Sequence, residues 1–174
     1  MQYCCMSRRM LWAVCVSFAL CVVVRAQVRS ITGEYRNYAE GFAVRIPSGL
    51  RGLTGDQAGP ERGVTISLAS GASVTVYGEP NSLEYKTAAE GIRDSLSQYC
   101  DSGKPVVSAA RVGKVHGAKG RVVCGERIIA EMLAVRSGGG PIYWLTLQTT
   151  NAHATADEPA FETIAHGFKI IAWR

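Results

Sequence analysis

The side chains that act as general bases near neutral pH are few in this chain of 174 residues, which has three histidines, His116, His153 and His166. Nucleophilic catalysis needs such a base beside a serine, a cysteine or a similar nucleophile. The histidines are far apart in the sequence, and no Gly-x-Ser-x-Gly, His-Glu-x-x-His or Cys-x-x-Cys sequence occurs. The sequence therefore predicts no catalytic residue, no metal site and no cofactor.

Positive charge gathers in one segment. No acidic residue lies between Asp101 and Glu126, whereas this stretch holds five basic residues, namely Lys104, Arg111, Lys114, Lys119 and Arg121. On neighbouring strands these side chains would form a positive patch that binds an acidic partner. The alternative is a solvated sheet edge whose charges discourage aggregation.

The first 26 residues have the order of a secretory signal peptide. Arg8 and Arg9 precede an apolar run, 11–24, and a small-residue cleavage site follows at Ala26, so that Gln27 would begin the exported chain. The run is short for a membrane-spanning helix, and an uncleaved anchor is the alternative. The paired arginines also fit twin-arginine export, whereas the strongly apolar middle favours the general secretory route. We therefore expect a secreted or periplasmic protein with no membrane-spanning segment after cleavage.

Removal of this leader changes both the charge and the cysteine content. The leader holds three of the 19 basic residues and none of the 14 acidic ones, so the net charge falls from +5 to +2. A charge of that size does not indicate a nucleic-acid partner. Only Cys100 and Cys124 remain of the six cysteines, and two cysteines in an exported domain indicate one disulfide. Two buried thiols, or an incomplete metal pair, are the alternatives.

The hydrophobic pattern predicts hairpins, a helix, more strands and a second helix. Residues 27–33 are expected to form a flexible arm, and the glycine-rich stretch 48–63 a loop. Apolar residues three or four apart predict a helix over 85–100, and Asp157 is expected to cap another. Alternating apolar residues predict strands at 34–38, 42–47, 64–68, 73–77, 106–115, 119–124, 128–136, 141–150 and 169–173. Glu79 and Pro80 are expected to break the strand before them.

This order of elements predicts an α+β fold with a mainly antiparallel sheet, in a single domain that covers residues 34–174. The remaining chain is long enough to bury a core of its own. The core is expected to depend on residues that recur on one face of each element: Phe42, Ile46, Ile66, Ile92, Leu96 and Phe168.

Two short stretches near the ends of this domain carry a family resemblance. Tyr35-Arg36-Asn37-Tyr38, followed by Gly41-Phe42-Ala43-Val44-Arg45-Ile46-Pro47, resembles the opening of PsbP-like domains. Phe161-Glu162-Thr163-Ile164-Ala165-His166-Gly167-Phe168 is similar to their final helix, which commonly ends in Ser-Phe. The resemblance extends over about residues 34–173. This superfamily includes the photosystem II extrinsic subunit and Ran-binding relatives.

The resemblance implies an α/β/α sandwich around an antiparallel sheet and, mostly, binding rather than catalysis. We therefore expect an exported, non-enzymatic binding or assembly module of the cell envelope. Its partner would be another envelope protein or an acidic surface. The alternatives are an extracytoplasmic enzyme with an unrecognised site, which needs a pocket joining a histidine to a carboxylate, and a carrier of a small ligand or lipid, which needs an apolar cavity.

Overall fold

The structure, a computed structural model, describes residues 28–55, 62–82, 84–101, 103–135 and 140–172. The leader and the expected cleavage site between Ala26 and Gln27 lie outside these residues. The main sheet has eight strands, each antiparallel to its neighbours, in the order β1 (Arg29–Ile31), β4 (Arg51–Thr54), β5 (Gly63–Ser67), β6 (Ser73–Pro80), β10 (Pro141–Thr150), β9 (Arg127–Val135), β8 (Val115–Cys124) and β7 (Val106–Val112).

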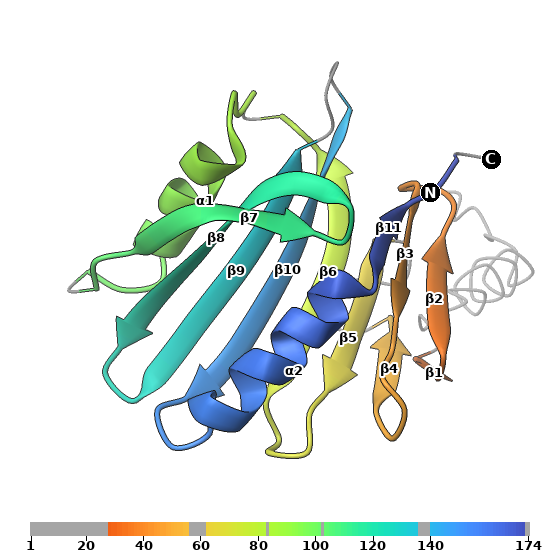
Figure 1. Cartoon of the computed structure of the whole chain (residues 1–174), viewed down its shortest axis with the longest axis horizontal. Helices are drawn as coiled ribbons and strands as arrows, with labels where there is room; N and C mark the ends of the chain where they lie inside the picture. The colour runs from red at the N-terminus through yellow and green to blue at the C-terminus, as the bar shows by residue number, and fades with distance from the viewer. Residues whose placement is uncertain (1–27, 56–61, 83, 102, 136–139, 173–174) are drawn as a thin grey trace, which may run out of the picture.

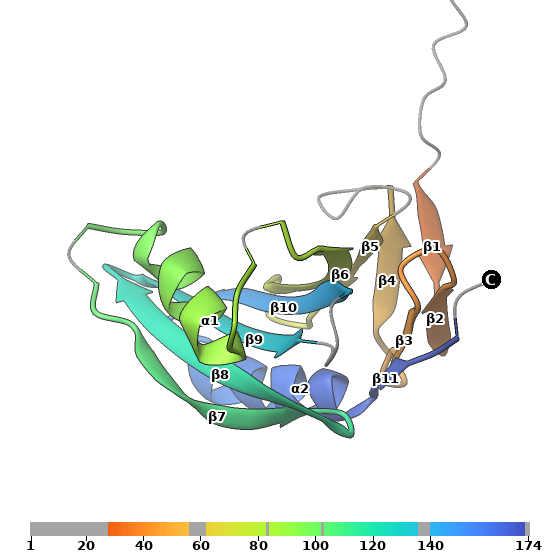
Figure 2. The same cartoon turned by 90° about the horizontal axis from the view of Figure 1, so that it is seen from above.

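One helix covers each face of this sheet (Figure 1). The first, α1 (Ala88–Ser97), packs on β8 and β9, and the second, α2 (Ala154–His166), lies on the opposite face, as Figure 2 shows. The predicted α+β class and the α/β/α arrangement are therefore confirmed. Neither helix among the described residues combines the length and the apolar character needed to cross a membrane.

Strand alternation divides the core into two layers. On β9, Ala130 and Met132 belong to the layer under α2, whereas Ile129 and Leu133 belong to the layer under α1. This division follows from the period of two residues, which sends successive side chains to opposite faces. All six predicted core residues are at most 2% exposed, which confirms the hydrophobic pattern on which they were chosen.

The two stretches that carry the family resemblance meet in a small second sheet. Its order is β11 (Phe168–Ile170), β3 (Phe42–Arg45) and β2 (Glu34–Asn37), so the end of the domain pairs with its beginning. The ring of Phe42 lies 5.8 Å from those of Tyr35, Tyr143 and Phe168. Aromatic burial therefore joins the second sheet to β10 of the first.

Two segments expected to be irregular form strands. Residues 29–31 of the predicted arm are β1, which pairs with β4, and β4 itself lies inside the predicted loop. Gly52 permits this packing, because a Cβ atom there would lie only 2.6 Å from a methyl group of Val64. The glycines of this loop therefore partly serve close packing, which composition alone does not distinguish from a turn.

Other element boundaries also differ from expectation. β6 continues through Glu79 and Pro80, because Pro80 stands opposite Pro141 at the strand's last position, where a missing N–H does little harm. β8 begins at Val115, earlier than predicted. The turn before it contains Gly113, which has a φ of +58° and donates its N–H to the carbonyl of Ala165.

Candidate functional site

A groove of about 180 Å³ runs between α2 and the strands β7, β8 and β9. Met132 and Phe161 contribute apolar surface to it, and Val106 and Ser108 border it from β7. Basic side chains of β8 and acidic side chains of α2 also line the groove. It thus combines an apolar lining with a charged border, as ligand-binding sites commonly do.

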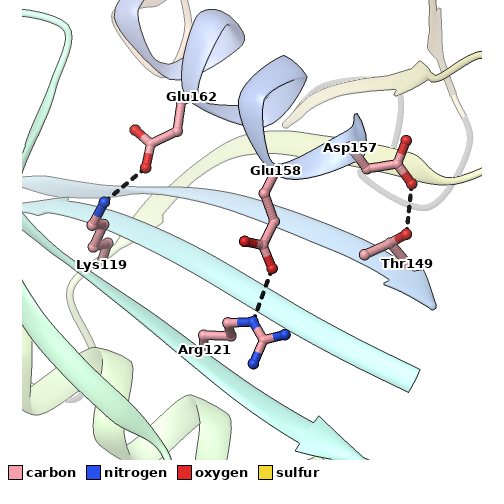
Figure 3. A network of polar contacts seen from close by, with 6 residues as sticks. All are labelled: Lys119, Arg121, Thr149, Asp157, Glu158 and Glu162. Atoms are coloured by element: carbon pink, nitrogen blue, oxygen red, sulfur yellow. Dashed lines mark hydrogen bonds and ion pairs between the residues drawn. The ribbon is translucent and has the colours of Figure 1, made fainter. Parts of the chain in front are cut away.

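Two ion pairs connect the sheet to α2 across this groove (Figure 3). Lys119 Nζ lies 2.8 Å from Glu162 Oε1, and Arg121 Nε lies 2.8 Å from Glu158 Oε1. The pairs match because two residues along a strand and four along a helix advance by a similar distance, about 6–7 Å. All four side chains are more than one-third exposed, so each pair is worth at most about 1 kcal/mol.

Asp157 anchors the first turn of α2 from within the protein. It is 3% exposed and accepts hydrogen bonds from the hydroxyl groups of Ser70 and Thr149 (Figure 3 shows the second). The prediction that Asp157 caps the helix is wrong, because the helix begins earlier, after His153. A carboxylate with two hydroxyl donors instead fixes α2 to the β5–β6 turn and to β10.

The predicted positive patch requires a correction. Lys119 and Arg121 point toward α2 and are paired with acids, whereas Arg111 lies opposite His116 in the ladder and so faces away from them. The cause is strand alternation, which sends residues of odd and even register to different faces. Lys104 and Lys114 stand just outside the two ends of β7. The five bases therefore do not share one face, although three of them surround β7.

The disulfide expected from the cysteine count is present. Cys100, just after α1, is bonded to Cys124 at the end of β8, with their Cα atoms 5.8 Å apart. That distance is ordinary for a disulfide. The bond ties α1 to the sheet at the end of the helix and supports an oxidising environment for the protein.

Sequence reasoning missed a buried carboxyl group beneath α1. Glu131, only 1% exposed, accepts hydrogen bonds through Oε1 from Ser95, Tyr99 and Thr146, whereas Oε2 has no partner among the described residues. Burial raises the pKa of Glu131 to about 6, and the three hydroxyl donors only partly oppose this. An acidic residue in the middle of the apolar strand 127–135 was the signal in the sequence.

The histidines do not come together in a site. His116 lies in β8, whereas His153 and His166 stand at opposite ends of α2, and all three are exposed. Neither the groove nor a depression of about 680 Å³ beside Arg45 and Arg51 has a histidine among its described lining residues. Within the described ranges, no group of three or more His, Cys, Asp or Glu side chains is arranged to hold a metal ion.

Of three comparisons with known proteins, the one with solved structures supports this architecture. No protein-family model matches the chain, and a search of curated proteins finds no match. Among solved structures, cyanobacterial PsbP (CyanoP) from Synechocystis sp. PCC 6803 has a TM-score of 0.54 and 16% sequence identity, over 86% of this chain and 95% of that one. A structure from Bacteroides thetaiotaomicron has a TM-score of 0.45 and 12% identity, over 80% of this chain and 48% of its own. The chain therefore has a PsbP-like fold, as the two short sequence stretches predicted.

Proposed function

We propose that this protein is an exported, non-enzymatic binding or assembly module of the cell envelope, and that residues 1–26 are its signal peptide. The observation that carries the proposal is the PsbP-like fold over most of the chain, since the resemblance to such domains implies mostly binding rather than catalysis. The arrangement of the described polar residues agrees with this function. The buried carboxyl groups of Asp157 and Glu131 accept hydrogen bonds from hydroxyl groups, and no histidine accompanies either of them in these contacts.

Export is supported by the Cys100–Cys124 disulfide, because such bonds persist mainly in oxidising compartments. The order of charge, apolar run and small residues in 1–26 supports the same conclusion. The partner would be another envelope protein or an acidic surface, since an exported module meets its partners in the envelope. The domain has a modest net charge once the leader is removed. This charge does not favour nucleic acid.

The proposal is tested by producing the full chain with a C-terminal tag and measuring its intact mass in each cell fraction. We expect a chain that begins at Gln27, lies outside the cytoplasm and carries the disulfide. A matched chain that starts at residue 27 without the leader should stay in the cytoplasm with reduced cysteines. Full-length, reduced protein in the cytoplasm would contradict export.

Binding is tested separately by chemical cross-linking of the exported protein in intact cells. A non-enzymatic module should form a defined complex that persists when His116, His153 and His166 are all replaced by alanine. If the triple variant folds normally but no longer forms this complex, the result would instead favour the enzyme alternative.

A further inference from the structure

We propose that the outer edge of β7 binds an extended, acidic segment of a partner protein, which joins the main sheet as a ninth strand. This inference rests on the proposed function as a binding module. It adds the surface that binds and the chemistry of the segment that it accepts.

The first observation is that β7 is an open edge. It is the last strand of the main sheet and pairs only with β8 (Figures 1 and 2). Among the described residues, the one backbone hydrogen bond from this end of the sheet to another element involves Gly113, just beyond the strand. In an antiparallel ladder, alternate residues of an edge strand direct their N–H and C=O groups outward. These groups remain available to another strand.

The second observation is that the first five residues of this edge strand lack the usual protection. Natural sheets shield their edges with short strands, charges, prolines or bulges. The opposite edge, β1, has only three residues, whereas β7 has seven. Residues 106–110 of β7, Val-Val-Ser-Ala-Ala, contain no charge and no proline. Val106 is 74% exposed, so its apolar side chain is accessible to another chain.

The third observation is the charge around β7, which selects an acidic occupant. Lys104, Arg111 and Lys114 are exposed, and none of them forms an ion pair with a described residue. A second copy of this chain would bring the same positive charges together, which opposes pairing of β7 with itself. An acidic segment would instead place its carboxylates near these three bases and would be attracted to them at a distance.

The groove beside β7 indicates which uncharged side chains the partner segment carries. Side chains of an added strand alternate between the two faces of the sheet. Those on the α2 face would lie near Val106 and the apolar groove formed with Met132 and Phe161. The segment that fits best therefore alternates small apolar residues with glutamate or aspartate.

The test uses the exported protein and a fluorescein-labelled ten-residue peptide of alternating valine and glutamate, with a valine–lysine peptide as its control. We expect fluorescence anisotropy to show binding of the acidic peptide only, weaker at high salt. Alternate amide protons within 106–112 should become protected from hydrogen exchange when it binds. Two further acidic peptides, one N-methylated at every valine and the other at every glutamate, keep their charge. The one whose methyl groups face β7 loses strand hydrogen bonds and should bind at least about tenfold more weakly than the other.

Two protein variants with proline at neighbouring positions of β7 separate the effect on binding from the effect on folding. In an edge strand, of two adjacent residues one directs its N–H outward and the other toward β8. Of Ser108→Pro and Ala109→Pro, one should therefore keep a normal melting temperature but lose peptide affinity, and the other should destabilise the sheet. Lys104→Glu combined with Arg111→Glu should weaken binding about tenfold, whereas Arg93→Glu on α1 should leave it unchanged.

Several results would overturn the inference. Equal binding of acidic and lysine peptides, equal binding of the two N-methylated peptides, or unchanged amide exchange in β7 would each exclude acidic strand addition. A concentration-dependent dimer with protected β7 amides would identify a second copy as the occupant. Cross-linking in intact cells is independent of these peptides, so the binding function itself would still be judged separately.

Discussion

Replacing Glu131 with glutamine is expected to stabilise the protein at neutral pH and to remove part of its pH dependence. The carboxyl group is buried beneath α1 and faces only hydroxyl groups among its hydrogen-bond partners: Ser95 from α1, Tyr99 from just after α1, and Thr146 from β10. Tyr77 of β6 also lies close enough for the charge of Glu131 to raise its pKa, although burial is the larger cause. Glutamine keeps the shape of the side chain and removes the buried charge.

The magnitude follows from the pKa of Glu131, which burial raises from 4.5 to about 6. Between these values the folded protein retains a proton that the unfolded chain has released. The contribution of Glu131 to stability is therefore fully present below pH 4.5 and is lost as the pH rises through about 6. The loss amounts to about 2 kcal/mol, because a difference of one pKa unit between the folded and unfolded states corresponds to about 1.4 kcal/mol.

The assay is urea unfolding of the disulfide-bonded protein at several pH values between 4 and 8. The difference in unfolding free energy between E131Q and the unmodified protein should shift by about 2 kcal/mol in favour of E131Q over this range. This comparison cancels the other titrating groups and any constant effect of the new amide. Glu126→Gln, in the exposed turn between β8 and β9, should show no such shift. A pH-independent difference for E131Q would refute the reasoning.

Three further predictions concern the packing that positions the site. Ile92→Ala and Leu96→Ala, both at fully buried positions of α1, should each cost about 2–5 kcal/mol in urea unfolding, and losses under about 0.5 kcal/mol at both would contradict the helix register. Asp157→Ala should cost about 1–3 kcal/mol because Ser70 and Thr149 lose their shared acceptor, whereas Glu158→Ala should cost at most about 1 kcal/mol, and equal losses would contradict this ranking. Non-reducing mass spectrometry should give an intact mass two hydrogens lower than that of the chain with free thiols at Cys100 and Cys124. Two alkylatable thiols would contradict the disulfide.

The fold was largely predictable because its main elements follow simple periods. Strands such as 64–68 and 141–150 alternate or form apolar runs, and the stripe containing Ile92 and Leu96 repeats at helical spacing. The strands β1 and β4 were not predictable, because each is stabilised by pairing with a distant segment. Gly52 resembles a loop residue until the neighbouring Val64 and Ile46 are placed beside it.

The site was less predictable than the fold, since it depends on which residues meet across the sheet. The cysteine pairing required only a count, and it was correct. A correct prediction of the basic patch required knowledge of the direction of each basic side chain and of the acidic residues on α2. Glu158 and Glu162 are separated from their partners by 37 and 43 residues, and no local pattern reveals such pairs. The same holds for Glu131, whose partners come from α1, from the segment just after it and from β10.

The central claim, that the protein is exported and binds a partner through β7, is tested most directly by photo-cross-linking in the cells that produce it. A photoreactive amino acid is placed at the position of Val106, which is exposed on β7, and in a matched chain at the position of Arg93, which is exposed on α1. The account predicts one discrete, larger product from position 106, containing a leader-free chain joined to an acidic partner segment, and none from position 93. No product from position 106, or the same products from both positions, would contradict it.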